Sequence, residues 1–296
     1  MEPDHALPDE LPPSDEPSFA DDALLASHLA AGAGRVLLDL RLELGFEDPK
    51  ELKRLGDQRA HEHLTEALRR HRPADAVLSE EGADDERRLS APRVWIVDPL
   101  DGTREFSEEG RTDWAVHVAL WEKGELVAGA VALPARDTVL GTGEPLPHAS
   151  ARADATRTQG GRIRLAVSRS RPPRLTAPLA AALNAELVPM GSAGVKIASV
   201  LLGEADAYVH AGGQYEWDSA APVAVAAAHG LHASRIDGTP LTYNKQGAWL
   251  PDLLVCRPEH RDRLLAAVQE ACLAEPEPEP GPASEPGPAS EPEGTA

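Results

Sequence analysis

The segment best suited to chemistry is residues 94–106, where an apolar run ends in two aspartates, Asp98 and Asp101. The proline between them fixes φ and removes a backbone donor, and Gly102 tolerates a positive φ, so a tight loop is expected at a strand end. Such a loop can direct both carboxylates and the Leu100 carbonyl at one point. Three hard oxygen ligands at one point suit Mg²⁺.

The backbone amides of Gly102 and Thr103 add a second feature to this segment. If a helix starts here, its first N–H groups are free and suit a phosphate. The alternative is a surface turn, because turn residues are expected at any strand end. Both interpretations stay open on this segment alone.

Carboxylates recur at two other predicted element ends. Residues 76–82 form a short apolar run that ends in Glu80 and Glu81, which predicts a strand bounded by a turn. In residues 216–222, Asp218 can cap a helix whose body is small and apolar. Capping would explain Asp218 alone. It does not explain the order along the chain, in which acidic residues follow two successive strands and then recur at the start of a helix.

This order resembles the Mg²⁺-dependent, lithium-sensitive phosphatase family that contains inositol monophosphatase, fructose-1,6-bisphosphatase and 3′(2′),5′-bisphosphate nucleotidase. The resemblance covers about residues 20–272. Residues 98–106, Asp-Pro-Leu-Asp-Gly-Thr-Arg-Glu-Phe, are most similar to the CysQ-type nucleotidase branch, because inositol phosphatases usually carry Thr-Asn-Phe in the last three places. Residues 113–117, 191–196 and 211–218 match the same branch.

The resemblance implies ligands for two or three Mg²⁺ ions. The main set is Glu80, Asp98, the Leu100 carbonyl, Asp101 and Asp218. Asp57 falls where the family has a ligand of a third, looser metal site; the alternative is a solvated aspartate on a helix surface. Its neighbour Gly56 replaces a hydroxyl residue or alanine, and it puts the rigidity of this segment in doubt, since glycine inside a helix costs about 1 kcal/mol relative to alanine.

The resemblance also implies roles in catalysis, which it assigns to Glu80, Thr103 and Asp98. Thr103, with Glu80, would orient the attacking water, and the Gly102 and Thr103 amides would hold the scissile phosphate. Clustered Mg²⁺ would lower the pKa of the water and neutralise the phosphoryl oxygens, so no covalent nucleophile is needed. The implied substrate-binding residues are Asp101, Gly102, Thr103, Arg104, Lys196 and Asp218.

Lys196 lies one turn into a predicted helix. The resemblance to the nucleotidase branch implies that a lysine at this position contacts the phosphate that is not cleaved. The alternative is a surface lysine whose ammonium group reaches water. Arg104 is a similar candidate directly after the phosphate loop. Among the histidines, we expect His61 and His63 to face solvent, and His117 and His210 to be strand residues rather than ligands.

The hydrophobic pattern predicts the elements that must position these residues. Helices are expected at 21–44, 50–72, 174–184, 192–202, 218–229 and 258–272. Strands are expected at 75–79, 93–97, 114–121, 126–133, 163–167, 186–189, 206–210, 231–235 and 252–256, with a hairpin at 123–124. The alternation favours an α/β architecture, and the resemblance implies a layered α-β-α-β-α sandwich with the site at a subdomain junction.

The same pattern divides the chain into segments. We expect an acidic N-terminus at 1–20, an α+β subdomain at 21–145, a linker at 146–160, an α/β subdomain at 161–272 and a Pro/Glu-rich tail at 273–296. The two ends each hold six acidic residues and no Lys or Arg, so they carry 12 of the 20 net negative charges. Both are expected to be disordered; the tail is expected to aid solubility, with a docking role as the alternative.

Composition bounds the class of protein. The 296 residues, 42% of them hydrophobic, allow a large core, and no stretch approaches the ~20 apolar residues of a membrane span. The N-terminus lacks the basic and apolar regions of a signal peptide, and the two cysteines form no disulfide framework, so we expect a cytoplasmic protein. An acidic chain binds nucleic-acid polymers poorly, but Mg²⁺ can let it bind a small anionic nucleotide. A homodimer stays open.

The resemblance thus implies an enzyme, a Mg²⁺-dependent 3′(2′),5′-bisphosphate nucleotidase. It would hydrolyse the 3′-phosphate of adenosine 3′,5′-bisphosphate, a by-product of sulfate assimilation, to give AMP and phosphate. One alternative is an inositol 1-phosphate or fructose 1,6-bisphosphate phosphatase, because the metal loop is shared by these enzymes. Another is a non-catalytic metal-binding regulatory protein, whose signature would be the loss of a metal ligand or Thr103.

Overall fold

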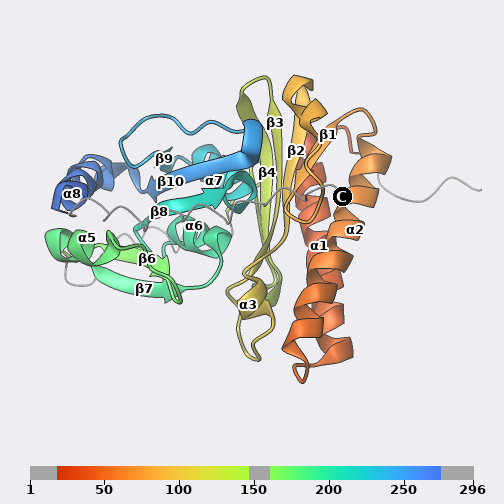
Figure 1. The fold of residues 1–296 in the computed structure, drawn as a ribbon, viewed down its shortest axis with the longest axis horizontal. Coiled ribbons are helices and arrows are strands. Elements are labelled where there is room, and N and C mark those ends of the chain that lie inside the picture. The colour runs from red at the N-terminus through yellow and green to blue at the C-terminus, as the bar shows by residue number, and fades with distance from the viewer. Residues whose placement is uncertain (1–18, 147–160, 275–296) are drawn as a thin grey trace, which may run out of the picture.

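The computed structural model describes residues 19–146 and 161–274. Nearly all of the predicted acidic N-terminus, linker and tail therefore lies outside the described residues. The described elements stack in five layers, helix, sheet, helix, sheet and helix, as Figure 1 shows. This arrangement confirms the predicted layered α/β sandwich.

The first two layers come from the N-terminal half. Helices α1 (Asp22–Leu44) and α2 (Pro49–His71) cover one face of a sheet with strand order β1-β2-β3-β4-β5. Strands β1 and β2 are parallel, and the other neighbours are antiparallel. The strand bounds are β1 Ala76–Ser79, β2 Arg93–Asp101, β3 Ala115–Glu122, β4 Glu125–Leu133 and β5 Thr138–Gly141.

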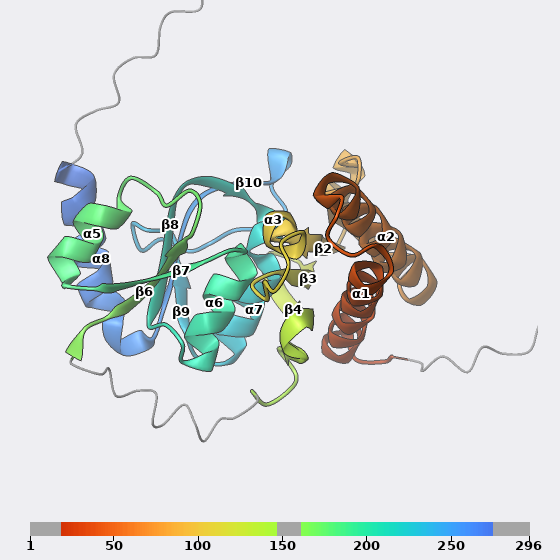
Figure 2. The same ribbon diagram turned by 90° about the horizontal axis from the view of Figure 1, so that it is seen from below.

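The C-terminal half supplies the other three layers, and Figure 2 shows its outer helices at the far side from α1 and α2. Helices α6 and α7 lie between the sheets, and α5 and α8 cover the outer face of the second sheet, whose order is β7-β6-β8-β10-β9. The helix bounds are α5 Thr176–Leu183, α6 Ala193–Leu202, α7 Ala220–Ala228 and α8 Arg261–Ala274. The strand bounds are β6 Arg164–Ser168, β7 Glu186–Met190, β8 Ala207–Tyr215, β9 His232–Ser234 and β10 Trp249–Cys256.

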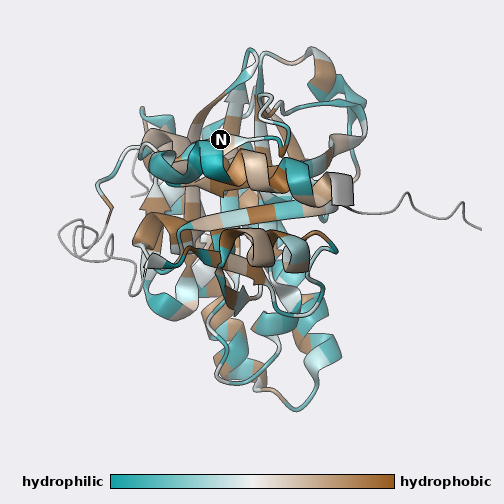
Figure 3. Ribbon diagram, turned by 90° about the vertical axis from the view of Figure 1, so that its left-hand side faces the viewer, coloured by the Kyte–Doolittle hydropathy of each residue, from teal (hydrophilic) through white to brown (hydrophobic). Residues whose placement is uncertain are grey.

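Strand β2 shows how the sequence makes these layers. Its side chains alternate between two hydrophobic clusters: Trp95 and Val97 pack with α1 and α2, whereas Val94 and Ile96 pack with α6 and α7. Successive strand side chains point to opposite faces, so a strand buried on both sides must be apolar throughout. The outer helices mix hydrophilic and hydrophobic residues, as Figure 3 shows, because they bury only one face.

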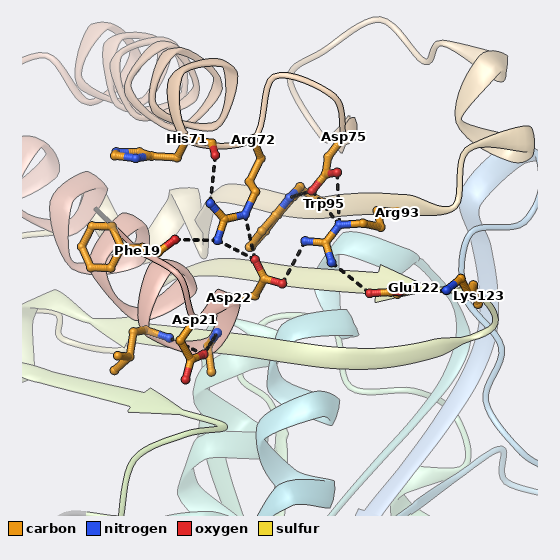
Figure 4. A network of polar contacts seen from close by, with 12 residues as sticks. Phe19, Asp21, Asp22, His71, Arg72, Asp75, Arg93, Trp95, Glu122 and Lys123 are labelled. Atoms are coloured by element: carbon orange, nitrogen blue, oxygen red, sulfur yellow. Dashed lines mark hydrogen bonds and ion pairs between the residues drawn. The ribbon is translucent and has the colours of Figure 1, made fainter. Parts of the chain in front are cut away.

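A network of ion pairs fixes the start of β2 (Figure 4). The Arg93 guanidinium contacts Asp22 on α1 at 2.9 Å, Asp75 before β1 at 3.0 Å and Glu122 at the end of β3 at 2.9 Å. Asp22 also pairs with Arg72, directly after α2, at 2.8 Å. Four elements are therefore joined at the end of β2 opposite Asp98 and Asp101.

The predicted elements are largely confirmed. The hairpin at 123–124 is a two-residue turn between Glu122 and Glu125, with both turn residues at positive φ. Some expectations were incomplete: β5 and the short α3 (Thr103–Phe106) were not predicted, β8 continues past residue 210 to Tyr215, and β10 begins at Trp249 rather than at residue 252. Glycines weaken a strand signal, and pairing with β10 supplies the hydrogen bonds that local sequence does not show.

Helix α1 is more apolar over its length than the composition suggested. By length and composition it is the one helix within residues 19–146 and 161–274 that could cross a membrane. Its apolar residues, including Leu25, Leu29 and Leu37, are instead buried in the cluster that covers the first sheet. This packing is that of a core helix.

Candidate metal and phosphate site

The ends of β1 and β2 bring the first carboxylates together. Ser79 pairs with Val97 in parallel register, so Glu80 lies beside Asp98. Between Asp98 and Asp101, β2 has one residue more than β3, which is a β-bulge. The predicted loop is thus a bulge within the last residues of β2. Bulges redirect side chains at the ends of sheets, and past this one Asp101 contacts the start of α6.

Asp101 is held by the start of α6. Its Oδ2 accepts hydrogen bonds from the Ser192 hydroxyl at 2.5 Å and the Gly194 N–H at 2.7 Å. Ser192 caps α6 and has a positive φ of 43°, a strained conformation for a residue with a side chain. Asp98 is buried, and its Oδ1 accepts the Leu100 N–H at 3.0 Å.

Asp218 comes from the other sheet. It ends a short 3-10 turn after β8, and its carboxylate accepts the Tyr215 N–H at 2.7 Å. The expectation that Asp218 caps α7 was wrong, because Ser219 occupies the position before that helix. Asp218 instead closes its own turn, which leaves a carboxylate oxygen for the cluster.

The carboxylates raise one another's pKa. Burial, then Glu80, Asp101 and Asp218, raises the pKa of Asp98 well above its usual range. Glu80 is exposed as a whole residue, yet withdrawal of its carboxyl group from water and then Asp218 raise its pKa to about 7. Burial and then Asp101 raise the pKa of Asp218 to about 7. Such a crowded set of hard oxygen atoms fits divalent cations, whose charge would favour the ionised forms.

His117 adds a contact that the sequence did not indicate. It is a strand residue, as predicted, and it is fully buried with Nε2 at 3.3 Å from Asp101 Oδ2 and Nδ1 at 3.1 Å from the Trp217 carbonyl. Its ring can offer one atom to a group with Asp98 and Asp101 in which all three atoms lie within 4.8 Å of one another. Its expected role as a non-ligand stays a prediction.

The start of α3 (Thr103–Phe106) follows the bulge. Gly102 has a φ of 88°, which the sequence allowed, and a helix starts there, which is the condition under which the amides suit a phosphate. The Thr103 hydroxyl donates to the Leu100 carbonyl at 3.2 Å and also hydrogen-bonds Asp57. Thr103 therefore has Asp57 as a partner. The joint role of Thr103 and Glu80 in orienting the water stays a prediction.

Asp57 and Gly56 show why α2 belongs to the site. Asp57 is partly buried, and its burial and then Glu81 raise its pKa to about 7. Its role as a ligand of a third metal ion stays a prediction. A Cβ on Gly56 would lie 2.8 Å from the Phe106 ring and 3.0 Å from Leu100. The missing side chain at Gly56 thus lets α2 pack closely against Leu100 and Phe106. The effect of Gly56 on the rigidity of this segment stays a prediction.

Lys196 is buried, so the surface-lysine alternative was wrong. Its Nζ donates to the carbonyls of Gly191 at 3.0 Å and Ser192 at 2.6 Å. Burial lowers its pKa, and Asp101 opposes that shift. Arg104 is exposed. His61 and His63 are partly buried rather than solvent-facing, and His61 Nδ1 lies 2.9 Å from the Ser79 hydroxyl.

One pocket of about 600 Å³ brings most of the predicted residues together. It is lined by Glu80, Asp98, Leu100, Asp101, Gly102, Thr103, Arg104, Lys196 and Asp218, whereas Asp57 is not part of its wall. Sequence reasoning missed the lining residues Ser168, Ser170, Arg171, Ser192, Tyr208, Tyr215 and Trp249. Only Ser192 carried a local signal, as a serine before a predicted helix.

Comparisons with known proteins agree with this geometry. The model of the inositol monophosphatase family matches residues 26–273. The chain is 48% identical over 261 residues to a 3′-phosphoadenosine 5′-phosphate phosphatase of Mycobacterium leprae, covering 84% of this chain and 94% of the relative. It is 50% identical over 244 residues to the protein of that name from Mycobacterium bovis, covering 81% and 90%. A crystal structure of CysQ from Bacteroides thetaiotaomicron is 27% identical, with a TM-score of 0.67 over 81% of this chain and 98% of that one.

Proposed function

We propose that this chain, which belongs to the inositol monophosphatase family, hydrolyses the 3′-phosphate of adenosine 3′,5′-bisphosphate to give AMP and phosphate. One observation carries the proposal: carboxylates from the ends of β1, β2 and β8 line one pocket with the start of α6. The relatives near 50% identity that are named 3′-phosphoadenosine 5′-phosphate phosphatases support the choice of substrate. In a cell the reaction would clear a by-product of sulfate assimilation.

The family is metal-dependent, and the carboxylate set supports Mg²⁺ as the metal. We propose two Mg²⁺ ions, with a third at a looser site as the alternative. When bound, Mg²⁺ would lower the pKa of the attacking water, neutralise phosphoryl oxygens and stabilise the leaving oxygen. The residues that would hold it are Glu80, Asp98, the Leu100 carbonyl, Asp101 and Asp218, with Asp57 for the third ion.

The chain's own residues would position the reactants. The Thr103 hydroxyl, oriented by Asp57 and the Leu100 carbonyl, would accept a hydrogen bond from the water, with Glu80 on its other side. The amides of Gly102 and Thr103 would hold the scissile phosphate. The water oxygen would then form a bond to phosphorus as the bond from phosphorus to O3′ breaks. Of the two protons of the water, one would end on O3′ and the other on the released phosphate.

Two cations would complete the site for a substrate with two phosphates. The buried Lys196 and the exposed Arg104 both line the pocket, and we assign them to the phosphate that is not cleaved. A cytoplasmic location and a homodimeric state stay predictions.

Phosphate release tests the proposal. Purified protein with Mg²⁺ is given adenosine 3′,5′-bisphosphate, inositol 1-phosphate or fructose 1,6-bisphosphate, and the highest kcat/KM is expected for the nucleotide. A preference for either of the other substrates would reject the nucleotidase assignment. No release from any of the three, by folded protein, would favour the non-catalytic alternative.

A further inference from the structure

Tyr215 and Trp249 form an aromatic wall in the pocket. Their exposed fractions are 44% and 48%, whereas Trp95 and Trp114 are fully buried. Large aromatic faces in contact with water are unfavourable, and covering them releases free energy. The wall is therefore a place where a bound molecule can bury apolar surface.

The aromatic wall is held in place before any ligand binds. Trp249 is the cross-strand partner of Tyr215, and their rings meet edge-on with centroids 5.3 Å apart. Trp217 stacks on Tyr215 at 4.6 Å. Gly213 has a φ of +90°, and a Cβ there would lie 1.7 Å from the Trp249 indole, so any other residue would displace that ring. A preorganised surface loses little entropy on binding.

The aromatic wall adjoins the carboxylate end of the pocket. The Tyr215 N–H donates to the Asp218 carboxylate at 2.7 Å, and both residues line the same space. Lys196 and Arg171 place cations on the pocket surface as well. A molecule that satisfies every part of this surface therefore carries phosphate, further negative charge and a planar aromatic group.

We infer that Tyr215 and Trp249 form the subsite for the planar base of a nucleotide, and that this subsite selects nucleotides over polyol and sugar phosphates. The inference rests on the proposed function and adds the residues that recognise the base. A base can stack on the free indole face and exclude water from it. Inositol and fructose phosphates have no aromatic face and gain nothing from this contact.

Kinetics with two matched substrates test the subsite. Trp249→Ala should raise KM for adenosine 3′,5′-bisphosphate by roughly 5- to 100-fold, the range expected for stacking of one base on an aromatic side chain, and leave kcat nearly unchanged. The KM for the 3,5-bisphosphate of 1,2-dideoxyribose, which lacks the base, should not change. Trp249→Phe should restore most of the affinity, because a flat ring returns.

A control variant separates stacking from general damage. Leu187→Ala removes another exposed apolar side chain, 43% exposed, that does not line the pocket, and both KM values should stay at wild-type levels. If Trp249→Ala changes KM equally for the two bisphosphates, or changes KM for neither, the inference of a base-binding subsite is wrong.

Binding without turnover distinguishes this inference from the proposed reaction. Calorimetry should show AMP binding more tightly than ribose 5-phosphate to the wild type, with that difference lost in Trp249→Ala. A protein that leaves adenosine 3′,5′-bisphosphate intact but keeps this binding difference would reject the proposed reaction and support the subsite. Hydrolysis of the nucleotide without this difference would reject the subsite alone.

Discussion

The Thr103 hydroxyl hydrogen-bonds the Asp57 carboxyl group, which joins the start of α3 to α2. If Asp57 acts by orienting Thr103, the two residues work as one unit, and their substitutions should not add. Thr103→Ala should lower kcat by about 100-fold, the lower end of the contribution of a positioned proton-transfer group. Adding Asp57→Asn to Thr103→Ala should then lower kcat only slightly further.

The measurement is kcat for the two single variants and the double variant at saturating Mg²⁺. If the fold-decrease in kcat of the double variant equals the product of the two single decreases, and Asp57→Asn needs more Mg²⁺, Asp57 acts instead as an independent ligand of a third ion.

The carboxylates of Asp98 and Asp218 are expected to share metal ions. Asp98→Asn or Asp218→Asn removes one charge from the cluster and should lower kcat by at least ~100-fold, about 2.7 kcal/mol of barrier. Glu81→Gln is the matched control, because Glu81 is exposed and absent from the pocket wall. If Asp98→Asn or Asp218→Asn keeps more than half of the wild-type kcat, the assignment of these residues to shared metal ions is wrong.

The raised pKa values of Glu80 and Asp218, both about 7, predict a metal effect on stability that depends on pH. The folded metal-free protein holds these protons more tightly than the unfolded chain does, so its free energy of unfolding should fall as the pH rises from about 4 to about 8. Mg²⁺ relieves the repulsion among ionised carboxylates. Its addition should therefore raise Tm more at about pH 8 than at about pH 5, as scanning calorimetry can measure. An equal rise at both values would argue against the cluster.

Lys196 supplies a test of how the second phosphate binds. Lys196→Met keeps much of the buried side-chain volume but removes the charge, and a charge-assisted contact is worth roughly 1.5 to 3 kcal/mol. KM for adenosine 3′,5′-bisphosphate should rise by about 10- to 100-fold, while KM for 3′-AMP should change little. Parallel changes for the two substrates would mean that Lys196 supports the start of α6 and does not bind the second phosphate.

The network at the start of β2 predicts how stability depends on acid. Burial alone would raise the pKa of Asp22, but its hydrogen bonds with Arg93 and Arg72 outweigh burial and lower it. This contribution is present above the ordinary Asp pKa and is lost as the pH falls through the lowered value. Arg93→Met should reduce the free energy of unfolding by about 1 to 3 kcal/mol at neutral pH, because Asp22, Asp75 and Glu122 lose the cation that they share.

The matched control is Arg54→Met, since Arg54 and Glu51 form an exposed pair on α2, 59% and 45% exposed, and such pairs contribute little to stability. Urea unfolding compares the variants with the wild type, and the deficit of Arg93→Met should shrink in acid. A deficit that is the same at every pH would assign the loss to packing rather than to the ion pairs.

Local sequence was sufficient for much of the fold and for the carboxylate set. The alternation in β2 decides which side chains face each layer, because successive strand residues point to opposite sides. The positive φ of Gly102 and the hairpin after Glu122 depend on neighbouring residues only, so turn chemistry predicted both. The same holds for the positions of Glu80, Asp98 and Asp101, since Glu80 follows β1 directly and the two aspartates lie in the last residues of β2.

Contacts between distant parts of the chain decided the rest. Gly56 serves the site because Phe106 packs against it, and Lys196 is buried because the second sheet covers the start of α6. Tyr215 and Trp249 lie side by side because β8 and β10 pair in register. The sequence alone determined which residues carry the charge and where the chain must turn. Only the tertiary structure decided which of those residues share a pocket, because burial and pairing depend on partners that local sequence does not name.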